Sequence, residues 1–364
     1  MTLTRRALLS SVAATAGLPF VHIAPAAELK PIKCIIPIPT LDESFAPFAV
    51  AKHVGYFKEE GLDVTFLTVR GSNEAGMQVS TGSVETAAAS PVDEVIGLQP
   101  GKDLDVKLFY QLYYRNIWHV AVLPDSPIQS VAELKGKKLG VIGMGSAGVA
   151  FGRAFLNAAG LDPQRDASFL PVGIGAQAIN AVRQHAVDAL VYPENLLNKL
   201  KVLGLEMRDV PVSEKLANLP DTSLFARRET FQNDPKTLIG LARAIDKGYY
   251  FNIANPAAAV KITWKLNPAA EPKNLPPDKA LDGGIFVNTE RMKIWKSPQT
   301  GPGHDGMFLE PQWKDFIDFM LQQKLISQPV PLDKIYTNAL IPEINKFDRA
   351  AVEKQAKEFD LKSL

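Results

Sequence analysis

Apolar positions in the first part of the chain alternate between two spacings. Short runs of apolar and β-branched residues predict strands at 32–36, 64–69 and 84–89. Between them, helical spacing and helix-start residues predict helices at 46–60, at 74–80 with Ser72 and Asn73 as N-cap candidates, and after Pro91. Alternating strands and helices indicate α/β layers with a mostly parallel sheet.

The same alternation recurs about one hundred residues later. Strands are predicted at 139–142, 169–172 and 187–191, and helices at 147–159, at 176–185 and after Pro193. At this offset Gly71 corresponds to Gly173, and residues 84–87 correspond to residues 187–190. Two similar α/β lobes explain this offset, and chance matching of a common α/β pattern is the alternative.

The pattern changes after Pro220. One strand is predicted at 223–226, followed by helices at 236–253, 256–266 and 311–324. A helical tail must bury its apolar face, and packing on the first lobe makes the second lobe an insertion. We therefore expect lobe one at 27–115 plus 221–364 and lobe two at 116–220, joined by two chain crossings that act as a hinge.

The N-terminus has the features of an export signal. Arg5 and Arg6 precede an apolar run at 7–23, and Ala24-Pro25-Ala26 provides small residues for cleavage. The alternative is a membrane anchor, but the run is shorter than the ~20 apolar residues of a spanning helix and contains polar residues. We expect a twin-arginine signal at 1–26, its removal, and a periplasmic protein.

Composition narrows the classes of function. The 364 residues carry a formal net charge of +1, which gives no electrostatic basis for binding nucleic acid. The one cysteine, Cys34, excludes an intrachain disulfide and a multi-cysteine metal site. The five histidines show no metal-ligand spacing, so we expect no metal and no cofactor.

In open α/β sheets, ligands bind beyond the carboxyl ends of the strands. The loops at these ends are predicted at 38–45, 70–73, 90–94, 143–148, 173–177 and 192–195. Phe45 and Tyr113, in or near these loops, suit an aromatic wall around a flat ligand. Asp93, Glu194 and other acids favour a ligand with an amine-like donor, or are solvated residues at helix starts. Asn195 lies in the same set of loops.

The sharpest local motif is Gly143–Gly148, which fits G-x-G-x-x-G between a strand and a helix. A dinucleotide site also needs an acid at the end of the next strand, and none follows Leu170 there. Free amides at a helix N-terminus favour an anion or an acceptor more generally, and a tight turn is the simpler alternative. Ser146 resembles a hydrolase nucleophile, but Met144 breaks G-x-S-x-G. If Gly143–Gly148 does hold a dinucleotide, the protein is instead a twin-arginine-exported NAD(P)-dependent oxidoreductase, and this is the rival function.

Several longer segments resemble a known family. They are APFAVA (46–51), GYFKEEGLDV (55–64), SVAELKGKKLGV (130–141) and VDA (187–189). They resemble periplasmic solute-binding proteins of ABC importers, in the group that binds sulfonates, taurine, nitrate and thiamine-pyrimidine precursors. The resemblance implies the two-lobed periplasmic-binding-protein fold (type II), a ligand closed between the lobes, and delivery to a permease with its ATPase.

The resemblance also assigns residues to the cleft. It points to Thr40, Gly71, Ser72, Asn73, Ser90, Pro91, Gly145, Ser146, Ala147 and Tyr192. Some relatives hold an aminopyrimidine with a carboxylate, and Glu194 is at a suitable place. The related fungal pyrimidine synthases use a cysteine-rich motif that Cys34 alone does not provide. We expect a monomeric, non-enzymatic protein that captures a small nitrogen- or sulfur-containing organic solute, with aromatic and heteroaromatic solutes included in that class.

Overall fold

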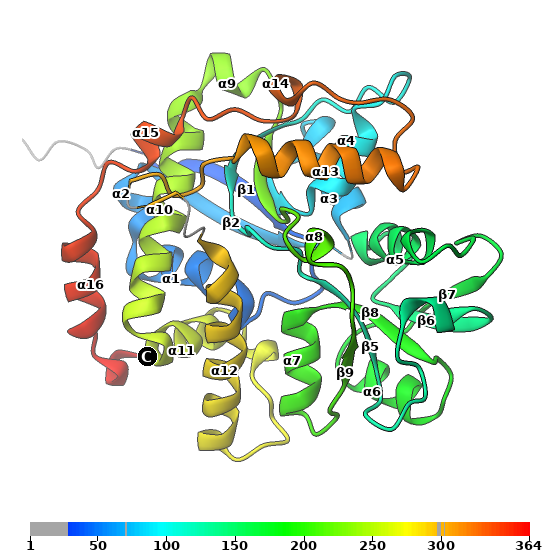
Figure 1. The fold of residues 1–364 in the computed structure, drawn as a ribbon. Coiled ribbons are helices and arrows are strands. Elements are labelled where there is room, and N and C mark those ends of the chain that lie inside the picture. The colour runs from blue at the N-terminus through cyan, green and yellow to red at the C-terminus, as the bar shows by residue number, and fades with distance from the viewer. Residues whose placement is uncertain (1–27, 70, 297–299, 302) are drawn as a thin grey trace, which may run out of the picture.

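Two five-stranded mixed sheets, each flanked by helices, organise the chain (Figure 1). The computed structural model describes residues 28–69, 71–296, 300–301 and 303–364. The first sheet has the order β2-β1-β3-β10-β4, in which β10 runs antiparallel to both of its neighbours. Its strands are β1 (Lys30–Ile36), β2 (Leu62–Thr68), β3 (Thr86–Ala89), β4 (Lys107–Gln111) and β10 (Ser223–Ala226).

The second sheet repeats this arrangement. Its order is β7-β6-β8-β5-β9, with β5 antiparallel to both of its neighbours. Its strands are β5 (Trp118–Val122), β6 (Lys137–Val141), β7 (Ala167–Pro171), β8 (Ala189–Pro193) and β9 (Arg208–Val210). In each sheet the antiparallel strand is the first one after a chain crossing. The offset seen in the sequence therefore relates two sheets of the same topology.

We use "lobe one" for the first sheet and the helices packed on it, and "lobe two" for the second. Lobe one includes η1 (Glu43–Phe45), α1 (Ala46–Val54), α2 (Tyr56–Glu59), α3 (Ser72–Ser80) and α4 (Pro91–Gly97). Lobe two includes η2 (Val131–Leu134), α5 (Ala147–Ala158), α6 (Ala176–Arg183) and α7 (Glu194–Val202), and α8 (Glu214–Ala217) lies where the chain returns to the first sheet. The residue boundaries proposed from the sequence, after 115 and after 220, remain predictions.

The chain passes between the sheets twice, at 112–117 and 211–222. The two crossings are hydrogen-bonded to each other. The Leu112 amide donates to the Thr222 carbonyl at 2.9 Å, and the Asp221 amide donates to the Tyr113 carbonyl at 3.1 Å. This paired segment forms the floor between the lobes.

After β10 the chain is helical. The helices are α9 (Thr230–Asn233), α10 (Pro235–Ala254), α11 (Pro256–Leu266), η3 (Pro268–Ala270), α12 (Pro277–Trp295), α13 (Glu310–Gln322), α14 (Leu332–Ile335), α15 (Ile341–Ile344), α16 (Arg349–Lys357) and η4 (Leu361–Ser363). Helices α10 and α11 pack on α1, and α16 packs on α10. Among the described residues, none of the helices combines the length and hydropathy needed to cross a bilayer.

The 19-residue helix α12 was missed in the sequence, and it contacts lobe two as well as lobe one (Figure 1). Its central Gly283 and Gly284 weakened the helical pattern. A Cβ at Gly283 would lie 2.5 Å from Val202 of α7, and one at Gly284 would lie 2.8 Å from Trp264 of α11. These glycines therefore allow α12 to fit closely between the two helices.

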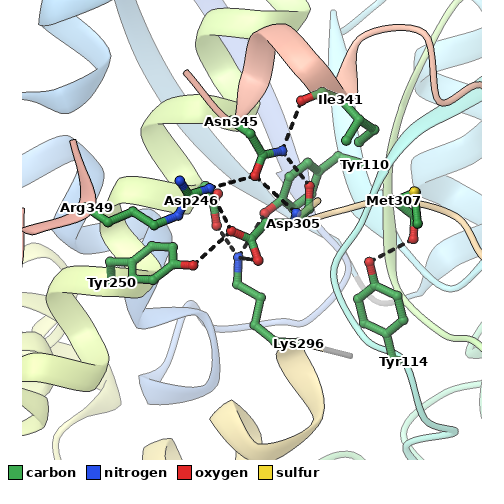
Figure 2. A network of polar contacts seen from close by, with 10 residues as sticks. All are labelled: Tyr110, Tyr114, Asp246, Tyr250, Lys296, Asp305, Met307, Ile341, Asn345 and Arg349. Atoms are coloured by element: carbon green, nitrogen blue, oxygen red, sulfur yellow. Dashed lines mark hydrogen bonds and ion pairs between the residues drawn. The ribbon is translucent and has the colours of Figure 1, made fainter. Parts of the chain in front are cut away.

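A buried ionic network holds segments of the tail together (Figure 2). Lys296, at the end of α12, pairs with Asp246 of α10 and lies 3.0 Å from Asp305. Arg349 of α16 lies 3.1 Å from Asp305, and the Tyr250 hydroxyl donates to that carboxylate at 2.9 Å. Charges of both signs are thus matched where the tail segments meet.

Three local predictions differ from the structure, and one lies outside it. The helix expected at 46–60 is divided at Gly55, whose φ of 101° favours glycine. The N-cap of α3 is Gly71, so Ser72 and Asn73 already belong to the helix. Pro193 ends β8 and caps α7 instead of opening it. The expected export signal at 1–26 lies outside the described residues.

Candidate ligand-binding site

A small cavity of about 40 Å³ lies between the two lobes. It is lined by residues of both sheets, of the crossings and of α12. They are Pro37, Ile38, Phe45, Gly71, Ser72, Ser90, Ile117, Trp118, Ile142, Ser146, Ala147, Pro193, Asn195, Asp221, Thr222 and Arg291. A water molecule occupies about 30 Å³ in the liquid, so the lobes are closed around a space far smaller than an organic solute.

Four helix N-termini converge on this cavity, because parallel strands deliver the following helices to the same edge of each sheet. Ser72 of α3 and Ser90, the N-cap of α4, come from lobe one. Ser146, the N-cap of α5, and Asn195 of α7 come from lobe two. The positive ends of these helices favour ligand acceptors or negative charge.

The lobes touch at Gly71 and Gly145. A Cβ on Gly71 would lie 2.1 Å from the carbonyl oxygen of Gly145, whereas a Cβ on Gly145 would meet nothing within 4 Å. Gly71 is extended, with φ 170°, so the need for glycine here comes from the contact between the lobes and not from its own backbone conformation. This contact closes the cavity on the side of α3 and α5.

A groove of about 940 Å³ lies outside that contact. Asn73, Asp93, Gly145 and Ser146 line it, together with residues of α5 and the segment 323–325. Ser146 lines both this groove and the closed cavity. The groove is therefore the outer mouth of the same cleft between the lobes.

The structure divides the candidate residues of the sequence into three groups. Those that line the closed cavity are Phe45, Gly71, Ser72, Ser90, Ser146, Ala147 and Asn195. Asn73, Asp93 and Gly145 line the mouth. The others, which line neither space, are Thr40, Pro91, Tyr113, Tyr192 and Glu194.

Glu194 already has a strong partner. Arg291 of α12 approaches it with Nε 2.5 Å from Oε1 and donates from Nη2 to Oε2 at 2.9 Å. The same guanidinium donates to Asn195 Oδ1 at 2.6 Å and lies over the Tyr113 ring, 4.4 Å from its centroid. Burial raises the pKa of Glu194, and Arg291 opposes that rise. Arg291 thus joins α12 to the start of α7.

A second buried cluster joins η1 to α7. Lys199 lies 3.1 Å from Asp42 and 3.0 Å from Glu43. Burial tends to raise the pKa of Asp42, but Lys199 and hydrogen bonds from Ser44 hold it below its usual value. The same acids raise the pKa of Lys199 to about 12 against the effect of burial. Asp42 and Glu43, which lie in the predicted loop 38–45, are therefore buried and paired acids, and the alternative of solvated helix-start residues does not apply to them.

Four polar or aromatic residues of the cavity had no signal in the sequence analysis. Trp118 follows the first crossing, Asp221 and Thr222 lie on the second, and Arg291 comes from the missed helix α12. The indole Nε1 of Trp118 is buried and has no hydrogen-bond partner among the described residues. An alternation pattern locates loops after strands, but it does not show which side chains of a crossing face a cavity.

Three acids near the cavity lack a cation: Glu94 and Asp221 are buried, and Asp93, at the mouth, is half-buried. Burial raises the pKa of Asp221 to about 7, and it does the same for Asp93. Burial raises the pKa of Glu94 well above its usual value, and the charges of Asp93 and Asp221 add to the rise. None of the described lysines, arginines and histidines lies within ion-pair distance of these three carboxylates.

The G-x-G-x-x-G segment folds as a loop that leads into α5. Ser146 Oγ accepts from the Gly148 amide at 3.2 Å and so caps the helix. A Cβ on Gly148 would lie 2.6 Å from the Trp118 ring and 3.0 Å from the Val191 carbonyl oxygen, so this glycine serves helix–sheet packing. Within the described residues, no group of three or more metal-ligating side chains is gathered.

Two curated proteins are similar to this chain over most of its length. The riboflavin-binding protein RibY of Chloroflexus aurantiacus is 25% identical over 308 residues, which cover 82% of each chain. The formylaminopyrimidine-binding protein of Halalkalibacterium halodurans is 22% identical over 296 residues, covering 79% of this chain and 84% of the relative.

Solved structures share the fold. The alkanesulfonate-binding protein SsuA from Xanthomonas axonopodis pv. citri, bound to MOPS, has a TM-score of 0.63 at 16% identity and covers 86% of this chain and 99% of its own. The desulfurization enzyme DszB has a TM-score of 0.54 at 12% identity, covering 86% and 98%. The fold is therefore that of the periplasmic binding proteins, as the sequence predicted.

The family model described as NMT1/THI5 like matches residues 42–259, which include the motifs that carried the resemblance. The match begins at Asp42, the N-cap of η1, and includes both crossings and the whole of lobe two. The resemblance seen in the sequence is thus confirmed, and this chain belongs to the NMT1/THI5-like family.

Proposed function

We propose that this protein is an extracytoplasmic binding protein that captures a small organic solute between its lobes and delivers it to an ABC importer. The observation that carries the proposal is the closed cavity, which residues from both lobes and both crossings line together. A ligand that contacts both lobes stabilises the closed arrangement, because it gains contacts there that an open arrangement lacks.

The chemistry of the cavity favours an organic solute with both polar and flat apolar parts. Phe45 and Trp118 provide aromatic walls, and helix N-termini and serine hydroxyls provide polar contacts. Curated relatives are named for binding riboflavin and a formylaminopyrimidine, and a fold neighbour is an alkanesulfonate-binding protein. A nitrogen-containing, heteroaromatic solute is the class we favour, with sulfonates as the alternative.

The same proposal includes the route of the protein. The twin-arginine motif and small-residue cleavage site support export as a folded monomer into the periplasm, with 1–26 removed. The partners would be a permease and its ATPase. Both curated relatives are named as binding proteins, which supports a role without catalysis, although the fold also serves DszB.

A thermal-shift screen of the purified protein tests the function. The panel contains riboflavin, cytosine, methanesulfonate, taurine, nitrate, aromatic carboxylates and amino acids, with NAD and NADP as controls. A ligand at 100 times its dissociation constant adds about 2.7 kcal/mol to the free energy of unfolding, which raises the melting temperature by several degrees.

A shift with one class of solute supports the binding function and identifies the ligand chemistry. Small-angle scattering with and without that solute then measures closure of the lobes. A shift with NAD or NADP alone would replace the proposal with the oxidoreductase, and Gly143–Gly148 would then be its cofactor site.

A further inference from the structure

We propose that Asp221, on the second chain crossing, accepts an N–H group of the ligand and makes the cleft selective for solutes that carry such a donor. The inference rests on the proposed binding function. It concerns a residue that the family resemblance did not indicate, and it departs from the expectation that Glu194 holds a ligand amine.

The contacts of Asp221 leave one carboxylate oxygen poorly satisfied. Oδ1 accepts from the Thr222 amide at 2.6 Å and from the Thr222 hydroxyl at 2.9 Å. Oδ2 has only the Ser90 hydroxyl, at 3.5 Å. The residue has no exposed surface and lines the cavity. A buried carboxylate without strong partners is costly, so a donor from the ligand would satisfy Oδ2.

Glu194 is less suited to this role, because its carboxylate is held by two contacts from Arg291. To bind a ligand amine, it would have to give up a buried ion pair. Asp221 has no cation within ion-pair distance among the described residues. Of the two carboxylates, Asp221 is therefore the one that gains most from a ligand donor.

The charges around Asp221 are of both signs and come from three helices. Arg291 of α12 favours its ionised form, whereas Glu194 of α7 opposes it. Glu94 of α4 also interacts with it as a neighbouring acid. Its contact Ser90 caps α4, whose positive N-terminal end favours the carboxylate. These features explain how the acid can be buried in the absence of a ligand.

A second unsatisfied group complements Asp221. The Trp118 Nε1 donor is buried, lines the same cavity and has no partner among the described residues. The cavity of about 40 Å³ would have to widen to admit a ring, and lining groups from both lobes would then surround that ring. The two groups together fit a heterocycle with an N–H donor and an acceptor, such as a cyclic amide, imide or amidine.

The place of Asp221 links recognition to closure. Its own amide donates to the Tyr113 carbonyl on the other crossing, so its backbone belongs to the paired segment between the sheets. A ligand held by its side chain would bind directly to the segment about which the lobes move. Loss of that contact is expected to weaken both binding and closure.

Isothermal titration with two matched pairs of probes tests the proposal. Riboflavin is compared with N3-methylriboflavin, and 1-methylcytosine with 1,N4,N4-trimethylcytosine, since the added methyl groups remove the remaining N–H donors of each ring system. Wild-type protein, Asp221→Asn and Glu194→Gln are titrated in parallel, with nitrate and methanesulfonate as donor-free solutes. An asparagine keeps the shape of the side chain but turns the acceptor Oδ2 into a donor.

The expected result is that an N–H-bearing probe binds wild-type protein at least tenfold more tightly than its methylated analogue. Asp221→Asn should lose at least tenfold in affinity for that probe and little for the analogue. Equal losses for both members of a pair, or an affinity gap that persists in Asp221→Asn, would overturn the proposal. So would a larger loss in Glu194→Gln.

The pattern across the panel separates this inference from the proposed function. If nitrate or methanesulfonate binds and causes closure while neither N–H-bearing probe binds, the binding function stands and the role of Asp221 is refuted. If no solute of the panel binds, both fail. The methylated probes act on wild-type protein, so the comparison holds even if Asp221→Asn folds poorly.

Discussion

Two aspartates of this protein are fully buried, and their surroundings differ. Asp246, in the network of Figure 2, pairs with Lys296, which also contacts Asp305. Asp221, at the cavity, has only hydroxyl and amide donors. A buried charge with a matched partner serves to hold segments together. A buried charge without one marks a place where a partner from outside can bind.

Removal of Lys296 should have the largest effect on stability. In Lys296→Met, the carboxylates of Asp246 and Asp305 lose their shared cation, and Arg349 remains near Asp305 alone. We expect a loss of about 3–5 kcal/mol in the free energy of unfolding, measured by urea denaturation. Ligand affinity of the folded variant should not change, and a change would mean that the network extends its influence to the cleft.

Removal of the unpaired acid at the cavity should have the opposite effect and raise the free energy of unfolding. In Asp221→Asn, a buried carboxylate whose pKa is raised to about 7 is removed. The folded protein holds that proton above pH 3.8 while the unfolded chain releases it, so the wild type loses stability as pH rises from about 4 to 7. The variant should be more stable at pH 8 by up to about 4 kcal/mol.

Urea denaturation at pH 4 and pH 8 checks this difference. The two proteins should differ by less than about 1 kcal/mol at pH 4, because the carboxyl is protonated in the folded state and only about half ionised in the unfolded chain, whose pKa is 3.8. Asp305→Asn is the matched control, because Lys296 and Arg349 hold the pKa of that buried carboxyl below its usual value, so its loss should destabilise the protein at pH 8. A less stable Asp221→Asn at pH 8 would show that Asp221 is as well paired as Asp305.

The contact between the lobes provides a direct test of closure, although the expected change in free energy is smaller than for the two buried acids. Gly71→Ala places a methyl group against the Gly145 carbonyl oxygen, whereas Gly145→Ala has open space. We expect Gly71→Ala to lower the affinity for the screened ligand at least about tenfold, or 1.4 kcal/mol, and to keep the lobes apart in small-angle scattering. Equal behaviour of the two variants would contradict closure at this contact.

Removal of one helix cap at the cavity and of one in the tail should have the smallest effects on stability. Ser146→Ala removes the cap of α5 at the cavity, and Asp348→Ala removes the cap of α16, in which Oδ1 accepts from the Ala351 amide at 3.1 Å. Each should cost about 1 kcal/mol of stability, measured by thermal unfolding. Only Ser146→Ala should also weaken ligand binding, by a few fold, and a similar effect of Asp348→Ala would remove the distinction between the regions.

The sequence by itself determined the alternating elements and most of their order. Runs such as 32–36 and 223–226 have the spacing of strands, and 256–266 has that of a helix, because local periodicity follows from which face is buried. The family motifs at 46–64 and 130–141 identified the fold, and the loops after the strands contained nine of the cavity residues. These features depend on near neighbours in the chain.

The tertiary structure alone decided which side chains meet. Arg291 reaches Glu194 across 97 positions, and Lys199 reaches Asp42 and Glu43 across more than 150. Helix α12 escaped detection because Gly283 and Gly284 are selected by contacts with Val202 and Trp264, which its own pattern does not reveal. Whether a buried acid is paired, as Asp246 is, or unpaired, as Asp221 is, depends on distant segments, because electrostatic energy follows distance in space and not separation along the chain.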